Sequence, residues 1–245
     1  MKVVYGILTA VPKEMTYYLE QLQNRTEEKV DGILYYFGSL AQKNVVLTAA
    51  GWGTTCTAVI MTHLINHFKP RAVFFSGTAG GIKEGILQGE VVIGESAFEI
   101  DMFNLISTCK NTPFEAGLIH DSKKEIQPPE YFSAEELIST ARKVSQTAIT
   151  KFYIGRLATT NHFPLRISDY KLIKEKNTFA IAMEGSAVYQ TSWLLSVPSL
   201  VVRGISMIYH PDGTDTGIQT AQTQLASDNA AKVVIEILKE INNGN

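Results

Sequence analysis

The sequence predicts an α/β protein in which a mixed β-sheet is flanked by helices on both faces. Apolar runs of strand length alternate along the chain with stretches of helical spacing, and the last helix carries a clear apolar stripe. With 245 residues, of which 45% are hydrophobic and 19% charged, the chain can bury a large core. We therefore expect one domain over residues 1–245.

The first third of the chain begins with an apolar strand over residues 3–10. Residues 12–22 follow with helical spacing and a proline in the first turn, which predicts a helix. Residues 32–38 and 44–51 are β-rich segments on either side of Gln42-Lys43, and this pattern predicts a hairpin. Residues 54–68 predict a helix that ends before Lys69-Pro70.

The remaining elements follow the same alternation. Residues 71–76 predict a buried strand that runs into a glycine loop at 77–81, and residues 90–95 predict another strand. Residues 101–129 lose periodicity and are expected to form a long surface excursion. Beyond it the sequence predicts a helix opened by a capping box at Ser133, a strand at 151–160, a helix ending near Lys176, a helix at 183–196, a strand at 200–206 and a terminal helix.

Composition excludes several classes of partner. The 22 basic and 24 acidic residues give a net charge of -2, and the basic residues are scattered, so we expect no nucleic-acid partner. No apolar run approaches a membrane span and the first run is too short for a signal peptide, so we expect a cytoplasmic protein without a membrane partner. Cys56 and Cys109 lack a Cys-x-x-Cys spacing and are expected to be free thiols.

Cofactor and metal motifs are equally scarce. Neither the glycines at 77–81 nor Gly51-Trp-Gly53 complete a dinucleotide fingerprint or a P-loop, so we expect no cofactor. His63 and His67 stand four apart, as zinc ligands on a helix can, but the glutamate of metalloproteases is missing beside His63. We read both as structural or surface histidines and expect no metal.

The carboxyl ends of the predicted strands indicate where a ligand binds. In layered α/β folds ligands gather at the carboxyl ends of strands, which here are the segments after Ala10, Ser76, Thr160 and Ser206. Glu14 follows the first of these ends by four residues. Glu184 lies in an apolar setting at a helix start, where a carboxylate serves either as a cap favoured by the helix dipole or as a ligand-holding group.

Five segments together resemble the nucleoside phosphorylase and nucleosidase superfamily, and within it the 5'-methylthioadenosine/S-adenosylhomocysteine nucleosidases. The likeness covers nearly the whole chain in order, spacing and context. The segments that carry it are Ala10-Val-Pro-Lys-Glu14, Ser76-Gly-Thr-Ala-Gly-Gly81, Thr159-Thr-Asn-His-Phe163, Ala182-Met-Glu-Gly-Ser-Ala187 and Val201-Val-Arg-Gly-Ile-Ser206.

The resemblance implies a role for each of these sites. Glu14 matches the glutamate that activates the attacking water, Arg203 matches the arginine that helps to orient it, and Glu184 matches the acceptor of ribose hydroxyl hydrogen bonds. The implied lining of the pocket is Ala10, Trp52 on the ribose side, Thr78, Gly80, Phe163 stacked on the base, Ala182, Met183 and Ser206. The family's phosphate-handling arginines have no counterpart at 11–14, so water is the expected acceptor.

The resemblance also implies a homodimer. In this family the neighbouring subunit completes the pocket around the 5' substituent of the nucleoside. The long loop around Phe103 and Pro113 is the segment that we expect to contribute to the partner's pocket.

One position departs from the family pattern. An aspartate directly after the serine donates a proton to the leaving purine in the family, and Met207, which can donate nothing, stands in its place. A missing general acid costs ~10²–10⁴ in rate. Three explanations stay open: a proton from His210, Asp212 or Asp215, a leaving group that needs no acid, or binding without turnover.

The predicted function is hydrolysis of the N-ribosidic bond of a 5'-modified purine nucleoside, with release of the free base. Cleavage leaves an oxocarbenium-like sugar and an anionic base, so carboxylates on the sugar side suit the chemistry. The alternatives are a catalytically impaired nucleoside-binding protein, and a futalosine hydrolase or a nucleoside phosphorylase of the same fold.

Overall fold

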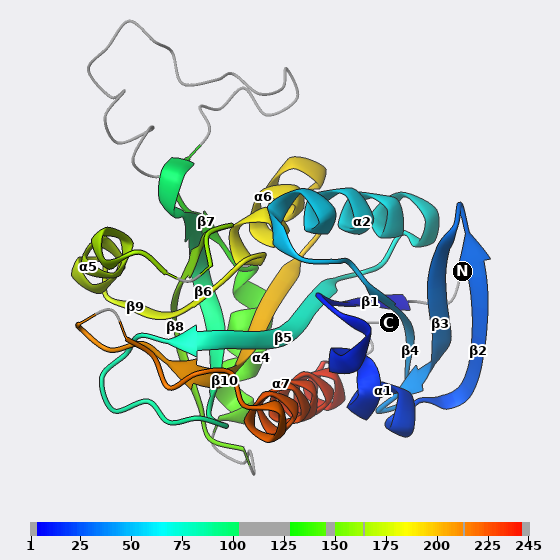
Figure 1. The fold of residues 1–245 in the computed structure, drawn as a ribbon. Coiled ribbons are helices and arrows are strands. Elements are labelled where there is room, and N and C mark those ends of the chain that lie inside the picture. Colours follow the sequence, from blue (N-terminus) through cyan, green and yellow to red (C-terminus); the bar gives the residue numbers. More distant parts are fainter. Residues whose placement is uncertain (1–3, 103–127, 146–149, 164, 213, 242–245) are drawn as a thin grey trace, which may run out of the picture.

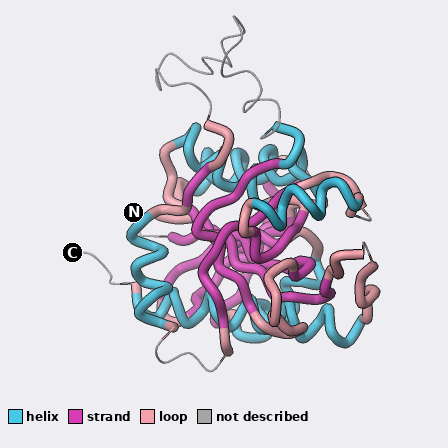
Figure 2. Tube along the Cα trace, turned by 90° about the vertical axis from the view of Figure 1, so that its left-hand side faces the viewer, coloured by secondary structure: helices cyan, strands magenta, loops and turns pink. Residues whose placement is uncertain are grey.

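A mixed ten-stranded sheet lies between layers of helices in the computed structural model, as the sequence predicts (Figures 1 and 2). The structure describes residues 4–102, 128–145, 150–163, 165–212 and 214–241. The strands are β1 (Val4–Thr9), β2 (Gln23–Val30), β3 (Ile33–Leu40), β4 (Lys43–Ala49), β5 (Val73–Gly81), β6 (Val91–Glu99), β7 (Tyr131–Phe132), β8 (Phe152–Thr159), β9 (Thr178–Ala182) and β10 (Ser199–Ile208). The helices are η1 (Pro12–Met15), α1 (Thr16–Gln21), α2 (Gly53–Phe68), α4 (Glu135–Val144), α5 (Ile167–Glu175), α6 (Gly185–Leu195) and α7 (Thr220–Glu240).

The strand order explains how distant segments meet. It runs β10-β6-β8-β9-β5-β1-β4-β3-β2, and an additional pairing of β10 with β5 closes five of these strands into a ring. β1, β4, β5 and β10 pair in parallel, so their carboxyl ends lie at the same edge. The segments that follow β1, β4 and β5 therefore approach one another, which is the arrangement that binds ligands in such folds.

Helices cover the sheet on both faces because each carries an apolar side. α7 packs on β10 and β5 together with α4, and α2 and α6 pack on each other across the opposite face (Figure 1). Val233, Ile237 and Leu238 of the predicted apolar stripe are fully buried, and Ile241 at its end is partly buried. A Cβ at Gly204 would lie 1.8 Å from the backbone oxygen of Ala226, so β10 and α7 touch through a residue without a side chain.

The sequence prediction missed three strands, β2, β7 and β9. Every residue from Gln23 to Lys29 in β2 is exposed, so this edge strand lacks the apolar alternation by which strands are recognised. β9 is a five-residue strand directly before the predicted helix at 183–196. The predicted surface excursion at 101–129 lies mostly outside the described residues, as do Phe103, Cys109 and Pro113.

Two local predictions were wrong. Residues 77–81 are not a loop but the end of β5, because their backbone pairs with Arg203 to Ile208 of β10. The helix at α4 begins after Ala134 without a side-chain cap, so Ser133 does not form the predicted capping box. The backbone N–H of Ser133 instead donates to the carbonyl of Glu95 at 3.0 Å, which holds this residue against β6.

A search of the described helices for a membrane-spanning segment gave none of sufficient length and apolarity. Cys56 is exposed and free, as the cysteine spacing predicts.

Candidate active site

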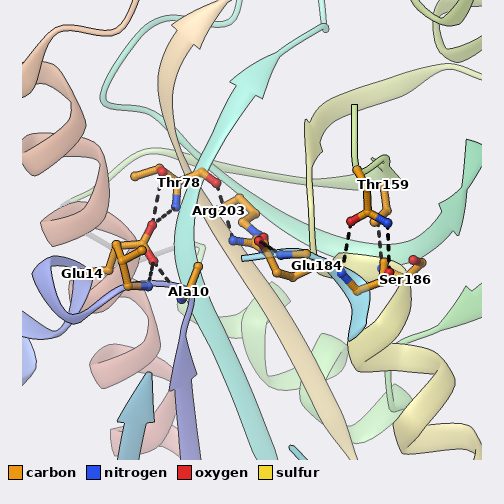
Figure 3. Close-up of polar contacts among 11 residues, drawn as sticks. Ala10, Glu14, Thr78, Thr159, Glu184, Ser186 and Arg203 are labelled. Carbon is orange, nitrogen blue, oxygen red and sulfur yellow. Dashed lines mark hydrogen bonds and ion pairs between the residues drawn. The ribbon is translucent and has the colours of Figure 1, made fainter. Parts of the chain in front are cut away.

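Glu14 is buried at the turn after β1, with 6% of its surface exposed. Pro12 begins the η1 turn, where its missing N–H costs nothing, and Glu14 closes the turn by accepting the N–H of Val11 at 3.3 Å. The same oxygen, Oε2, accepts the N–H of Ala10 at 2.9 Å. The other oxygen, Oε1, accepts the N–H of Thr78 at 2.9 Å and its hydroxyl at 3.2 Å (Figure 3).

The electrostatic environment of Glu14 suits a base. Burial raises the pKa of its carboxyl above the ordinary value, while the charge of Arg203 and the N–H donors of Thr78, Val11 and Ala10 oppose this rise. A carboxylate with a raised pKa binds a proton more readily than an exposed glutamate does. Its four donors also hold the carboxylate in one orientation.

Arg203 and Glu184 form a buried ion pair next to Glu14. Nη2 of Arg203 lies 3.0 Å from Oε2 of Glu184, and the two side chains are 1% and 4% exposed. Nη1 of Arg203 is 3.5 Å from the carbonyl oxygen of Thr78, and its guanidinium lies 4.6 Å from the ring centre of Phe75. Nε of Arg203 is buried and has no partner in the described part of the chain.

The second oxygen of Glu184 reaches α2. Oε1 of Glu184 accepts the N–H of Gly53 at 3.1 Å, although the two residues are 131 positions apart. Glu184 occupies the N-cap position of α6 but its side chain makes no capping hydrogen bond. The hydroxyl of Thr159 at the end of β8 accepts the N–H of Ser186 at 2.9 Å instead. The sequence left two interpretations open for Glu184, a helix cap or a ligand-holding carboxylate. Its bonds to Arg203 and Gly53 favour the second.

Gly77 explains how two charged groups fit against β5. A Cβ at this position would lie 2.8 Å from Oε1 of Glu14 and 2.9 Å from Nη1 of Arg203. Only a residue without a side chain leaves room for both groups on this side of the strand. Gly80 is similar, because a Cβ there would lie 2.4 Å from Cε2 of Tyr209.

The two aromatic residues of the predicted lining are both exposed. Trp52 is 72% exposed and precedes Gly53, while Phe163 is 56% exposed and follows β8. Asn161 connects the segment after β8 to the start of α2, because its side chain accepts the N–H of Thr54 at 3.2 Å and donates to the hydroxyl of Thr54 at 3.0 Å. The sequence prediction assigned Asn161 no such bond. Ala182 and Met183, before Glu184, are half-buried.

Met207 follows a β-bulge and packs in an apolar cluster. The pairing of β10 with β5 shifts between Ile205 and Met207, so Ser206 has no partner in that register. Met207 is 5% exposed and belongs to the same cluster as Phe98, Ile181 and Tyr209. Ser206 lies beside it at 8% exposure, and its hydroxyl donates to the carbonyl of Ala79 at 3.3 Å.

The residues proposed as substitute acids lie in the loop after β10. Asp212 is exposed, and hydrogen bonds from the hydroxyl and N–H of Thr214 lower the pKa of its carboxyl. Asp215 accepts the N–H of Gly217 at 2.7 Å, and His210 is exposed. A lowered pKa leaves Asp212 ionised at neutral pH, which does not suit a proton donor.

Known proteins resemble this chain over nearly its whole length. The sequence model of the phosphorylase superfamily matches residues 4–239. The chain belongs to the phosphorylase superfamily. Among similar proteins, the 5'-methylthioadenosine/S-adenosylhomocysteine nucleosidase of Listeria monocytogenes is 26% identical in an alignment that covers 96% of this chain and 99% of that protein.

Solved structures of superfamily members extend the likeness. The MTA/SAH nucleosidase of Streptococcus pneumoniae, in complex with 8-aminoadenine, is 25% identical with a TM-score of 0.79, covering 98% of this chain and 100% of that one. The futalosine hydrolase of Helicobacter pylori shares the fold with a TM-score of 0.81 at 21% identity, covering 98% of each chain. The family predicted from five segments of sequence is thereby confirmed.

Proposed function

We propose that this chain is a nucleosidase that hydrolyses the N-ribosidic bond of a 5'-modified purine nucleoside of the methylthioadenosine or S-adenosylhomocysteine type. The observation that carries the proposal is the buried group formed by Glu14 after β1, Arg203 on β10 and Glu184 after β9. The names of its relatives in Listeria and Streptococcus support the same substrate class.

Each charged residue has a role in this proposal. Glu14, with its raised pKa, takes a proton from the attacking water. Glu184 accepts hydrogen bonds from the ribose hydroxyls and carries negative charge near the sugar as it becomes cationic. Arg203 holds Glu184 in place through the 3.0 Å ion pair, and its buried Nε offers a donor to the water.

The remaining predicted residues complete the pocket. Phe163 and Trp52 are exposed aromatic side chains on loops joined by Asn161 and Thr54, and they close over the base and the ribose when a nucleoside binds. Ala10, Thr78, Gly80, Ala182, Met183 and Ser206 line the space between. We further propose that the protein acts in the cytoplasm as a homodimer, whose partner closes the pocket around the 5' substituent.

A second function has one specific observation in its favour. Met207 packs among apolar side chains at the position where the family resemblance implies a proton-donating aspartate, and Asp212 in the following loop is held ionised. Such a site binds nucleosides with little turnover.

Release of free base separates these functions. The purified protein is incubated with methylthioadenosine, S-adenosylhomocysteine, inosine and uridine, each with and without phosphate, and free base is measured by chromatography. Phosphate-independent release of adenine from the first two supports the proposal, and Glu14→Gln abolishes it. Calorimetric binding without base release assigns the chain to the second function, and phosphate-dependent release makes it a phosphorylase.

A further inference from the structure

Asp31, His63 and His67 meet where the β2–β3 turn lies beside the C-terminal half of α2 (Figure 1). Oδ2 of Asp31 is 3.1 Å from Nε2 of His63 and 3.2 Å from Nε2 of His67. One ligand atom from each of the three residues lies within 4.8 Å of the others. The sequence pattern indicates only the two histidines, because Asp31 lies 32 positions before His63.

The contacts of His67 leave a place for a cation between its ring and Asp31. Nδ1 of His67 lies 3.1 Å from the backbone oxygen of His63, and since a carbonyl only accepts, Nδ1 carries the proton. In the neutral ring Nε2 then has a lone pair, which faces the carboxylate of Asp31. Two acceptors 3.2 Å apart repel each other, and a metal ion between them converts both into ligands. A backbone carbonyl on the far nitrogen is the usual outer partner of a metal-bound histidine.

His63 has a comparable outer partner. Its Nδ1 lies 2.7 Å from the hydroxyl oxygen of Tyr35, whose side chain is buried on β3. When Nδ1–H donates to this oxygen, Nε2 is free to bind a metal on the side of Asp31. The rings of His63 and His67 are stacked with their centres 4.0 Å apart, so the two nitrogens are presented together.

The distances suit zinc. With bonds of about 2.0–2.1 Å, a tetrahedral zinc ion separates neighbouring ligand atoms by about 3.3–3.4 Å. The observed separations of 3.1 and 3.2 Å therefore need little change to admit the ion. The side chains of Asp31 and His67 are 69% and 40% exposed, so water can reach the fourth position. Imidazole nitrogen and carboxylate oxygen are both common zinc ligands.

We propose that Asp31, His63 and His67 bind a divalent transition-metal ion, with Zn²⁺ the best match. The ion fastens the β2–β3 hairpin to α2. β2 is an exposed edge strand that pairs only with β3 in the described sheet, so it gains most from such an attachment. The site shares no residue with the group of Glu14, Arg203 and Glu184, so it stands independently of the proposed function.

Metal binding tests the site directly. Protein treated with a chelator is dialysed against Zn²⁺, and the bound metal is counted by mass spectrometry. The expected result is one Zn²⁺ per chain, with affinity lowered at least about tenfold in Asp31→Asn, His67→Ala and Tyr35→Phe. Asparagine tolerates the positive φ of 50° at position 31, so Asp31→Asn removes the charge and keeps the turn. Co²⁺ in place of Zn²⁺ reports the coordination geometry by its visible absorption.

Controls make the result decisive. His162→Ala removes a histidine from the loop after β8 and retains wild-type metal binding, and circular dichroism confirms that every variant is folded. Zn²⁺ also raises the Tm of the wild type and not that of Asp31→Asn. Wild-type protein that retains no stoichiometric metal overturns the proposal, and the contact is then an ion pair with doubly protonated His67. Equal binding by folded Asp31→Asn and His67→Ala overturns it as well.

Discussion

Removing one partner of the Glu184–Arg203 ion pair is expected to destabilise the fold strongly. Glu184→Gln keeps the shape of the side chain and its hydrogen bond from Gly53, but it turns an amide N–H₂ toward Nη2 of Arg203. The arginine is 1% exposed, so water cannot compensate for the lost charge. Breaking a buried pair in this way costs about 3–5 kcal/mol. In a chain of 245 residues that lowers Tm by about 6–20 °C.

A double-mutant cycle isolates the interaction. Arg203→Met alone leaves the carboxylate of Glu184 buried and is expected to cost a similar amount. The double variant removes both charges, so its loss falls short of the summed single losses by at least about 1–3 kcal/mol. Chemical denaturation followed by circular dichroism gives the four free energies of unfolding. Arg142→Gln is the matched control, because Arg142 and Glu95 form a pair that is 56% and 50% exposed, and its loss stays below about 1 kcal/mol.

Additive losses would contradict a direct interaction between Glu184 and Arg203. If the double variant loses the sum of the single losses to within about 0.5 kcal/mol, the two side chains act independently. The 3.0 Å contact then contributes nothing to stability.

Three further predictions concern the site and its support. The rate of hydrolysis falls as pH is lowered through the raised pKa of Glu14, because the base must be ionised. Arg203→Met moves this fall in rate to still higher pH, because the positive charge that lowers the pKa of Glu14 is lost. A pH–rate profile of the wild type and of Arg203→Met measures both effects. A fall in the wild-type rate at the pKa of an ordinary glutamate would contradict the role of Glu14. Met207→Asp raises the rate of methylthioadenosine hydrolysis at least about tenfold and lowers stability. Met207→Asn, which has no acid, gives no gain in rate. A folded Met207→Asp variant without a gain in rate contradicts the role assigned to this position. Gly204→Ala places a Cβ 1.8 Å from the backbone oxygen of Ala226 and costs at least about 1–3 kcal/mol in chemical denaturation, whereas unchanged stability would disprove the close contact.

Much of the fold follows from local pattern. Buried strands such as β1 and β10 are recognisable because their apolar runs have strand length, and α7 is recognisable because its stripe repeats at helical spacing. β2 cannot be predicted in this way. Its residues are exposed along nearly the whole strand, and only backbone pairing with β3 defines it. Edge strands carry little hydrophobic signal, because a strand is identified by the side chains that it buries.

The glycines of β5 show a second reason why local sequence can mispredict structure. A run from Gly77 to Gly81 resembles a loop because glycine favours loops by its conformational freedom. In the structure the glycines are needed in a strand, because Glu14, Arg203 and Tyr209 occupy the places of their side chains. Those neighbours come from other parts of the chain, so they cannot be predicted from the sequence of β5 alone.

Periodicity and short motifs in a fixed order were enough to predict the fold class and the family, and to nominate Glu14, Glu184 and Arg203 as site residues. Which groups become partners depends on the tertiary structure. It pairs Arg203 with Glu184, surrounds Glu14 with the donors of Ala10, Val11 and Thr78, and brings Asp31 to two histidines on another element. The physical reason is that hydrogen bonds and ion pairs act over a few ångströms in space, whatever the separation of their residues along the chain.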